Sequence, residues 1–424
     1  MSFNLYKDDD REANKVVEIL DSVMGSGKTS AIIKWIESHP NEKYIYVSPL
    51  LTEVEDGGRL HQNLKTVAFE SPKNVDSTKA EDMLRLLKDG ANISCTHSLY
   101  LGMTQEHFKY IQSNNYVVII DEEIDVIGGF TYYSRSDLDW LIDQNVITVC
   151  PKDGMVTWIG DRSKIDEKHK YKLFIAYSDA KALYASKRSE GMMVTQLPVK
   201  LFECAKRVII LTYMFEGNIL DSFLQLKGFE VKPFVEVSVE QVSKDLVRSL
   251  ITLVEPNKGM KSLGLSSSWY KSEKANNKTL SIVSNYIRYV AKQSGLESKY
   301  VAWCVPKGRA EKPKKSKTIL VKPNGFIEDS DKKSCYLSAT TRATNLYRHK
   351  QLMIHCYDRY PQVTVSAYLE DYGCPVDRQV FALSELLQWA WRGCIRDDKP
   401  MTLAIGSSRM YNLFKEWLEG ECDE

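Results

Sequence analysis

Short apolar runs that alternate with helical patterns constrain the fold of this chain more than any other feature. In the first half we expect strands at residues 16–20, 44–47, 91–95, 116–120 and 207–212. A helix is expected at 28–38, between the first two strands. Strands that alternate with helices are typical of a parallel sheet covered by helices. The sequence therefore predicts an α/β protein.

The same rhythm restarts in the second half of the chain. We expect helices at residues 240–254, 279–291 and 384–396, and strands at 352–357 and 401–405. The chain has 424 residues, whereas one hydrophobic core rarely serves more than about 250–300. Two tandem domains are therefore predicted, each with a mostly parallel sheet flanked by helices.

We place the boundary of the two domains after residue 235, which gives units at 1–235 and 236–424. An insertion is expected in the first domain at about 151–200, where probable turns interrupt the pattern. An exposed basic loop is expected in the second at about 306–317, which holds six basic residues and two prolines.

Charge and cysteine content exclude several classes of protein. The formal net charge of +1 excludes a histone-like polycation, but it leaves room for a local basic groove. The nine cysteines form no CxxC pair, which argues against a zinc ribbon and suits a reducing cytosol. No signal peptide and no apolar stretch of about 20 residues is found. We expect a cytoplasmic protein with no membrane segment.

A glycine-rich turn between the first strand and the first helix carries the strongest motif. It reads Asp-Ser-Val-Met-Gly-Ser-Gly-Lys-Thr from residue 21, the context of a Walker A P-loop. Such a loop cradles phosphates with its backbone N–H groups, while its lysine adds charge and its threonine binds Mg²⁺. Ser22 stands where the usual signature has its first glycine. The expected ATP-binding residues are Gly25, Ser26, Gly27, Lys28, Thr29 and Ser30.

Two acids follow the apolar strand at 116–120, as in a Walker B motif. Parallel strands end at one edge of a sheet, so Asp121 should lie beside the P-loop. There Asp121 can hold Mg²⁺ together with Thr29, and Glu122 can deprotonate the attacking water. With Lys28, these acids are the expected catalytic groups of an ATPase.

The helix expected at 384–396 distinguishes a two-domain motor from a bare ATPase. Gln388, Arg392 and Arg396 are spaced by four residues, which would align them on one helix face. Three polar groups on a helix rich in Leu, Trp and Ala need a polar or anionic partner. A triphosphate held by the other domain would be that partner, with both arginines acting on the γ-phosphate.

Several polar segments at strand ends are candidates for nucleic-acid contacts. They follow the second and third strands, precede the strand at 352–357, and lie in the basic loop. The candidate residues are Ser48, Pro49, Thr96, His97, Thr341, Arg342, Thr344, Asn345, Lys314 and Lys315.

Taken in order, these motifs resemble the superfamily-two helicases, and most closely their phage-type replication helicases. The resemblance covers nearly the whole chain, from Gly25–Thr29 to Gln388–Arg396. It departs in two motifs: the acidic motif reads Asp-Glu-Glu-Ile, and the final arginine follows the previous one by four residues rather than three.

The resemblance implies two RecA-like domains with ATP and Mg²⁺ in their cleft. It further implies a partner that is single-stranded or forked nucleic acid, with DNA favoured, and hydrolysis that steps the protein along a strand. Replication proteins are candidate partners. If the chain is phage-encoded, its location would be the host cytoplasm.

Other functions remain open at the level of sequence. A phage packaging motor shares the P-loop but also needs a nuclease domain with clustered carboxylates, which we do not find after residue 240. A small-molecule kinase would need one domain with a lid, whereas this sequence places Gln388–Arg396 on a second predicted sheet. An origin-binding protein, or another nucleic-acid-binding protein with weak ATPase activity, stays the main alternative.

Overall fold

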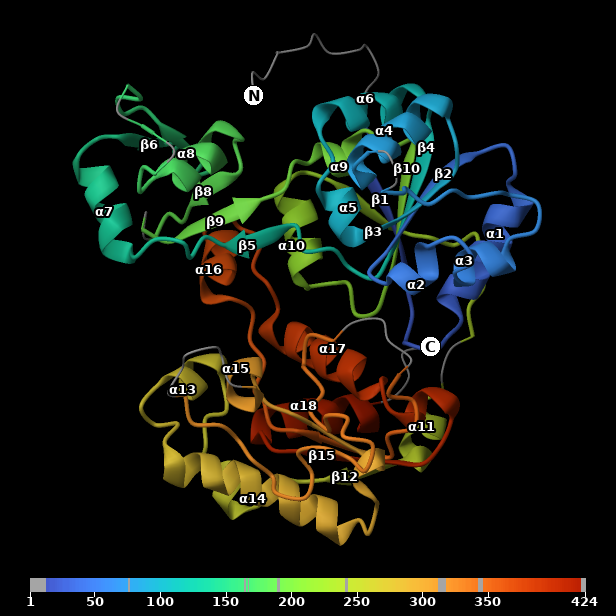
Figure 1. Cartoon of the computed structure of the whole chain (residues 1–424), viewed down its shortest axis with the longest axis vertical. Helices are drawn as coiled ribbons and strands as arrows, with labels where there is room; N and C mark the ends of the chain where they lie inside the picture. The colour runs from blue at the N-terminus through green and yellow to red at the C-terminus, as the bar shows by residue number, and fades with distance from the viewer. Residues whose placement is uncertain are drawn as a thin grey trace.

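Two α/β units lie one above the other in the computed structural model (Figure 1). The structure describes residues 13–74, 77–163, 165–166, 168–188, 191–240, 243–311, 318–341 and 346–420. Within these ranges no helix has the length and apolar character needed to cross a bilayer. The eight cysteines that the structure describes are free thiols.

The first domain is built on a six-stranded parallel sheet with the order β11-β1-β10-β4-β2-β3. Its strands are β1 (Val16–Asp21), β2 (Lys43–Ser48), β3 (Ile93–Thr96), β4 (Tyr116–Asp121), β10 (Arg207–Thr212) and β11 (Glu230–Pro233). The five strands expected from the sequence are confirmed, and the sixth, β11, lies at one edge. Because β10 separates β1 from β4, the loops that follow these three strands meet at one edge of the sheet.

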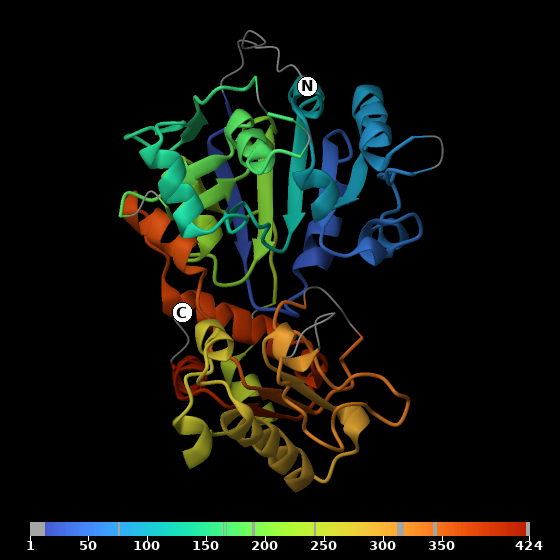
Figure 2. The ribbon, with the colours of Figure 1, turned by 60° about the vertical axis from the view of Figure 1, so that its left-hand side comes forward.

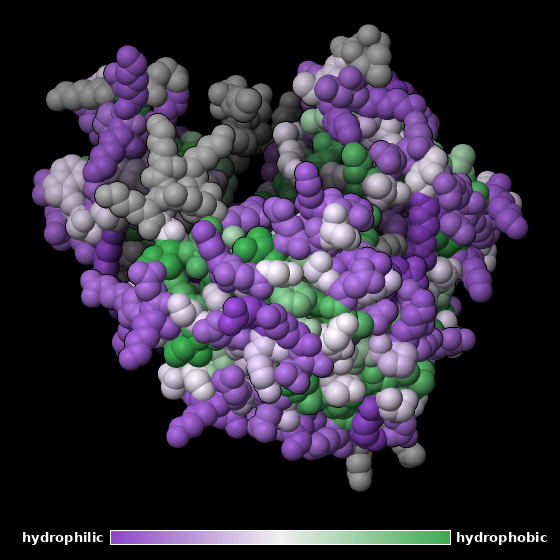
Figure 3. Space-filling view, turned by 60° about the horizontal axis from the view of Figure 1, so that its bottom comes forward, coloured by the Kyte–Doolittle hydropathy of each residue, from purple (hydrophilic) through white to green (hydrophobic). Residues whose placement is uncertain are grey.

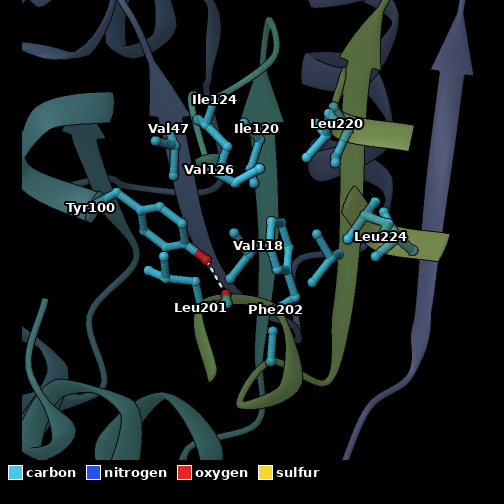
Figure 4. Packing of buried hydrophobic residues seen from close by; sticks show 14 of the residues in the cluster. Val47, Tyr100, Val118, Ile120, Ile124, Val126, Leu201, Phe202, Leu220 and Leu224 are labelled. Carbon is cyan, nitrogen blue, oxygen red and sulfur yellow. Dashed lines mark hydrogen bonds between the residues drawn. The ribbon is translucent and has the colours of Figure 1, made fainter. Parts of the chain in front are cut away.

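Helices cover both faces of this sheet, which explains why its central strands are apolar on both sides. One face is covered by α1 (Lys28–Ser38), α2 (Leu51–Val54) and α3 (Arg59–Asn63). The other face packs against α4 (Lys79–Asp89), α5 (His97–Leu101), α6 (Gln105–Ser113), α9 (Lys200–Glu203) and α10 (Ile219–Leu226). Figure 4 shows this second core, where the buried hydroxyl of Tyr100 donates a hydrogen bond to the carbonyl of Leu201.

Between β4 and β10 the chain leaves the sheet and forms a group of antiparallel strands with two helices. The elements are β5 (Ile127–Gly129), α7 (Arg135–Asp143), β6 (Ile147–Val149), β7 (Val156–Trp158), α8 (Lys172–Asp179), β8 (Leu183–Ala185) and β9 (Met193–Gln196). This group has its own apolar core, in which Phe130, Trp158 and Phe174 are buried. The bounds that we gave for the domains and the insertion stay predictions.

The second domain is built on a four-stranded parallel sheet with the order β12-β15-β14-β13. Its strands are β12 (Ile251–Val254), β13 (Val301–Cys304), β14 (Leu352–His355) and β15 (Met401–Ile405). The expected helix at 240–254 is wrong in its last part, because α11 (Lys244–Leu250) ends where β12 begins. The β-branched residues of β12 pair with β15 and complete the sheet, so tertiary pairing overrides the helical pattern.

This sheet is also covered on both faces. Helices α11, α17 (Arg378–Ala390) and α18 (Ser408–Glu419) pack on one face. The other face carries α12 (Lys258–Lys261), α13 (Ser267–Lys271) and α14 (Asn277–Gln293). The remaining elements are α15 (Lys307–Ala310) and the 3-10 helices η1 (Ser298–Tyr300) and η2 (Cys394–Asp397). On the side of the domain where α14 lies in Figure 1, Figure 3 shows hydrophilic side chains with hydrophobic ones among them.

Helix α16 (Val363–Asp371) follows β14 of the second sheet but packs against the first domain. Its Tyr368 and Leu369 belong to the core of the first domain, and its Asp371 pairs with Arg188. The chain then returns through α17, which lies between the two domains in Figures 1 and 2. The domains are therefore joined by three stretches of chain, before α11, before α16 and after α16.

Candidate nucleotide-hydrolysis site

The turn after β1 has the backbone conformation of a phosphate-binding loop. Gly25 and Gly27 have φ angles of +90° and +83°, which glycine adopts without the clash that a Cβ atom would cause. Helix α1 begins directly afterwards at Lys28, so its first N–H groups point out of the turn. Ser22 is buried, and its N–H donates to the carbonyl of Thr212 on the neighbouring strand (3.0 Å). The serine thus ties the loop to β10.

The side chain of Lys28 folds back over its own loop. Its ammonium donates to the carbonyls of Ser22 and Val23, the latter at 3.0 Å. Burial lowers the pKa of Lys28 to about 8, although the carboxylates of Asp121 and Asp21 oppose the shift. A half-buried ammonium that is held by carbonyl groups of its own loop is well suited to exchange them for phosphate oxygens.

Asp121 ends β4 at hydrogen-bonding distance from the P-loop threonine. One carboxylate oxygen accepts from the Thr29 hydroxyl (3.4 Å) and from the Tyr46 hydroxyl (2.9 Å). Burial raises the pKa of Asp121 to about 6, and the neighbouring charge of Glu122 adds to that effect. The hydrogen bond from Tyr46 acts in the opposite direction and favours the charged carboxylate.

Glu122 lies in a strained backbone conformation beside the second domain. Its φ angle of +64° is rare for a residue with a side chain and costs about 1–3 kcal/mol. One carboxylate oxygen lies 3.5 Å from the guanidinium of Arg392, whose side chain is only 4% exposed. Within the described residues, the other carboxylate oxygen and Arg392 Nε have no hydrogen-bond partner. This pair joins the domains yet leaves bonding capacity for a ligand.

These groups line a cavity of about 510 Å³, and residues of both domains form its walls. From the first domain it is lined by the P-loop, by the acids after β4 and by Arg59; from the second, by Arg348, Gln388, Arg392 and Arg396. Burial, together with the charges of Arg392, Arg348 and Arg59, lowers the pKa of Arg396. Crowded cations near a P-loop form a site that an anion of high charge would stabilise.

The helix expected at 384–396 is wrong in its bounds, although its three polar residues do meet at the cavity. Helix α17 ends at Ala390, and the chain turns at Gly393 before η2. A Cβ atom at Gly393 would lie 2.7 Å from Met401 Sδ and 3.1 Å from the carbonyl of Lys350. Close packing against the second sheet therefore ends the helix, and Arg396 reaches the cavity from η2 rather than from the same helix face.

Of the residues expected to contact nucleic acid, those after β2 and β3 lie beside the acids. Ser48 is buried, and its hydroxyl accepts from the N–H of Leu50 (3.3 Å), with half-buried Pro49 between them. Thr96 caps α5, and His97 Nε2 lies 2.8 Å from the carbonyl of Asp121. These two segments thus contact the site itself, and their binding role stays a prediction.

The remaining expected contacts lie in or near the second domain. Thr341 is half-buried, and its N–H donates to the carbonyl of Ser338 (3.1 Å). Five of the expected contact residues lie outside the residues that the structure describes: Arg342, Thr344, Asn345, Lys314 and Lys315.

Sequence reasoning included Tyr46 and Thr212 only in segments expected to contact nucleic acid or to couple the two sites, and it missed Arg59 and Arg348. Tyr46 bonds Asp121, and Thr212 donates to the carboxylate of Glu123 (2.9 Å), which links the acidic motif to the loop after β10. Arg59 and Arg348 line the cavity from segments without a recognisable motif. The bond of Tyr46 to Asp121 could have been anticipated from its position in the strand next to β4, because buried tyrosines need a hydrogen-bond partner.

Comparison with known proteins agrees with this architecture. Residues 245–418 match the family model described as the YonV C-terminal Rossmann-like domain. The chain is 28% identical, over 96% of its length and 99% of the relative's, to the SPbeta prophage-derived uncharacterized protein YonV of Bacillus subtilis strain 168. Among solved structures it is similar to an XPD helicase, with a TM-score of 0.51, 10% identity, and coverage of 95% of this chain and 94% of that one.

The chain has two RecA-like domains. The match to the XPD helicase extends over both sheets, and the two parallel sheets flanked by helices are those expected from the sequence. At this low identity the similarity establishes the fold alone.

The contact between Tyr46 and Asp121 leads to a prediction about pH. If Asp121 must be charged for hydrolysis, kcat/KM for ATP should fall as the pH drops below about 6, since protonation neutralises the carboxylate. Tyr46→Phe removes the bond that favours the charged form, so the acidic limb should move up by roughly one pH unit. A pH profile of both proteins, with melting temperature as a check on folding, measures the shift; coincident profiles would contradict it.

Proposed function

We propose that this protein is an ATP-dependent nucleic-acid helicase or translocase that hydrolyses ATP in the cavity between its domains. One observation carries the proposal. Lys28, Asp121 and Glu122 of the first domain line the same cavity as Arg392 and Arg396 of the second. A site divided in this way couples the state of the nucleotide to the relative position of the domains.

The residues present fit ATP and Mg²⁺. Thr29 and Asp121 offer two oxygen ligands on one side of the P-loop, and Mg²⁺ takes its remaining ligands from phosphates and water. Within the described residues no group of three or more His, Cys, Asp or Glu side chains could hold a metal alone, which suits an ion bound together with its substrate. When bound, Mg²⁺ would neutralise charge on the β- and γ-phosphates.

The protein side chains then divide the chemistry between them. Lys28 would exchange the carbonyls of Ser22 and Val23 for phosphate oxygens. Glu122 would accept a proton from the attacking water, and Arg392 would stabilise the charge that develops on the γ-phosphate. Glu122 and Arg392 already lie 3.5 Å apart, so the group assigned to the water and the group assigned to the γ-phosphate are close to each other before the nucleotide binds.

Nucleic acid is the partner that the fold supports best. The architecture is similar to that of an XPD helicase, and a curated relative of similar length comes from a prophage. We therefore propose that the strand is DNA, unwound during replication of a phage or mobile element in the host cytoplasm. A packaging motor would need clustered carboxylates, and the described part of the second domain has none.

Strand displacement on forked DNA and RNA substrates, with 5′ or 3′ tails, tests the proposal. We expect unwinding that requires ATP and Mg²⁺ and that weakens as salt rises, because phosphate contacts dominate such binding. Hydrolysis stimulated by a single strand but without displacement would indicate a translocase. Absence of both hydrolysis and strand binding would contradict the proposal.

Glu122→Gln separates hydrolysis from binding. This variant removes the proton acceptor but keeps the size of the side chain and the Thr29–Asp121 pair. We expect ATP to bind with nearly unchanged affinity while kcat falls by about 10²–10⁴. Equilibrium binding of ATP and single-turnover hydrolysis give both values. Loss of ATP binding in a folded variant would show that Glu122 holds the nucleotide instead.

A further inference from the structure

A second cavity of about 500 Å³ adjoins the P-loop. It shares Gly25, Gly27 and Ser30 with the first cavity, which makes the P-loop their common wall. Its other walls are the outer part of α1, with Lys34 and Ser38, and the segment 236–240 that follows β11. None of its lining residues is an arginine of the second domain.

We propose that this second cavity binds the base and ribose of the nucleoside triphosphate. The inference rests on the proposed function, because it assumes that the phosphates lie in the first cavity. There, Glu122 and Arg392 mark the γ-phosphate end, and Ser30 in the first turn of α1 lies where the two cavities meet. The nucleoside therefore leaves the P-loop past Ser30, where the second cavity begins.

The walls of the second cavity are fixed to the first domain. Trp35 is buried, and its indole N–H donates to the carboxylate of Glu236 (2.7 Å). Glu236 also accepts from Arg207 (2.7 Å), and the N–H of Phe234 donates to the carbonyl of Ile19 (2.8 Å). The cavity is therefore formed by α1 and the segment 236–240, without the sheet or the helices of the second domain. The carboxylate of Glu236 is already bonded, which leaves it little capacity to bind phosphate or base.

The lining suits a nucleoside better than another phosphate. The half-buried side chains of Val237 and Val239 line the wall opposite α1 and could pack against a planar base. The charged side chains of the lining are Lys34, Glu236 and Glu240, which together carry a formal charge of −1 and so disfavour a further phosphate. Ser26 is 6% exposed, and within the described residues its hydroxyl has no hydrogen-bond partner. A ribose or α-phosphate oxygen would give it one.

A blocking substitution tests the proposal in the full chain. Ser238→Trp places a large side chain on an exposed lining residue, whereas Val235→Trp does so on a neighbour that is 79% exposed and does not line the cavity. Binding of Mg²⁺–ATP and of inorganic tripolyphosphate is measured for each variant. We expect Ser238→Trp to weaken ATP by about tenfold or more, with tripolyphosphate unchanged and Val235→Trp like the wild type.

Each outcome decides between the two proposals. Equal ATP affinity in Ser238→Trp and wild type, or equal loss for ATP and tripolyphosphate, would overturn the nucleoside cavity. Ser38→Trp, on the wall formed by α1, repeats the test if the first variant does not fold. A wild-type protein that neither binds nor hydrolyses ATP would instead contradict the proposed function.

Discussion

Replacing Lys28 with alanine is expected to abolish ATP hydrolysis while the chain stays folded. Among the described residues, the hydrogen bonds of the ammonium go to carbonyl groups of its own loop, so its removal should cost little stability. Charge next to the β- and γ-phosphates would be lost, and with it most of the stabilisation of the phosphoryl-transfer transition state. Steady-state hydrolysis measures the loss, and circular dichroism and melting temperature confirm folding.

A surface lysine provides the matched control for that experiment. Lys109 is exposed on α6, on the opposite face of the first sheet from α1. Lys109→Ala should therefore hydrolyse ATP at the wild-type rate. Retained hydrolysis in a folded Lys28→Ala protein would show that the P-loop is not the site of the reaction.

Replacing Arg392 with lysine should have the second-largest effect, and mainly on kcat. Charge on the γ-phosphate grows in the transition state, so a positioned arginine contributes there, by about 10³–10⁵ in rate at comparable sites. Lysine keeps the charge but lacks the planar fork that can bond phosphate and Glu122 together. We expect kcat to fall steeply while the affinity for ATP changes little.

Arg378 at the start of α17 is the matched control, because it is exposed and absent from the lining of the cavity. Arg378→Lys should leave kcat unchanged. If Arg392→Lys hydrolyses ATP as fast as the wild type, the second domain does not take part in the chemistry, and the two-domain site would be wrong.

The sequence predicted those parts of the site that depend on local structure. The P-loop needs only a strand, two glycines with positive φ, and a helix. All of them lie in one short segment, Val16–Ser38. The acids after β4 were placed correctly because parallel strands end at the same edge of the sheet. Such patterns are readable without knowledge of tertiary contacts.

The sequence could not predict those parts of the fold and of the site that depend on tertiary packing. Helix α17 stops at Ala390 because Gly393 packs against β15, although the sequence continues a helical pattern to residue 396. Helix α16 lies in the second half of the sequence but packs in the core of the first domain. Arg59 and Arg348 reach the cavity only because of such long-range packing.

Steady-state ATP hydrolysis by the full chain with Mg²⁺, with and without single-stranded DNA, tests the central claim most directly. The proposed mechanism predicts a basal rate that rises when the strand is added and falls back as salt displaces it. An absence of hydrolysis under both conditions, or a rate that the strand does not change, would contradict a nucleic-acid motor driven from the cavity between the two domains.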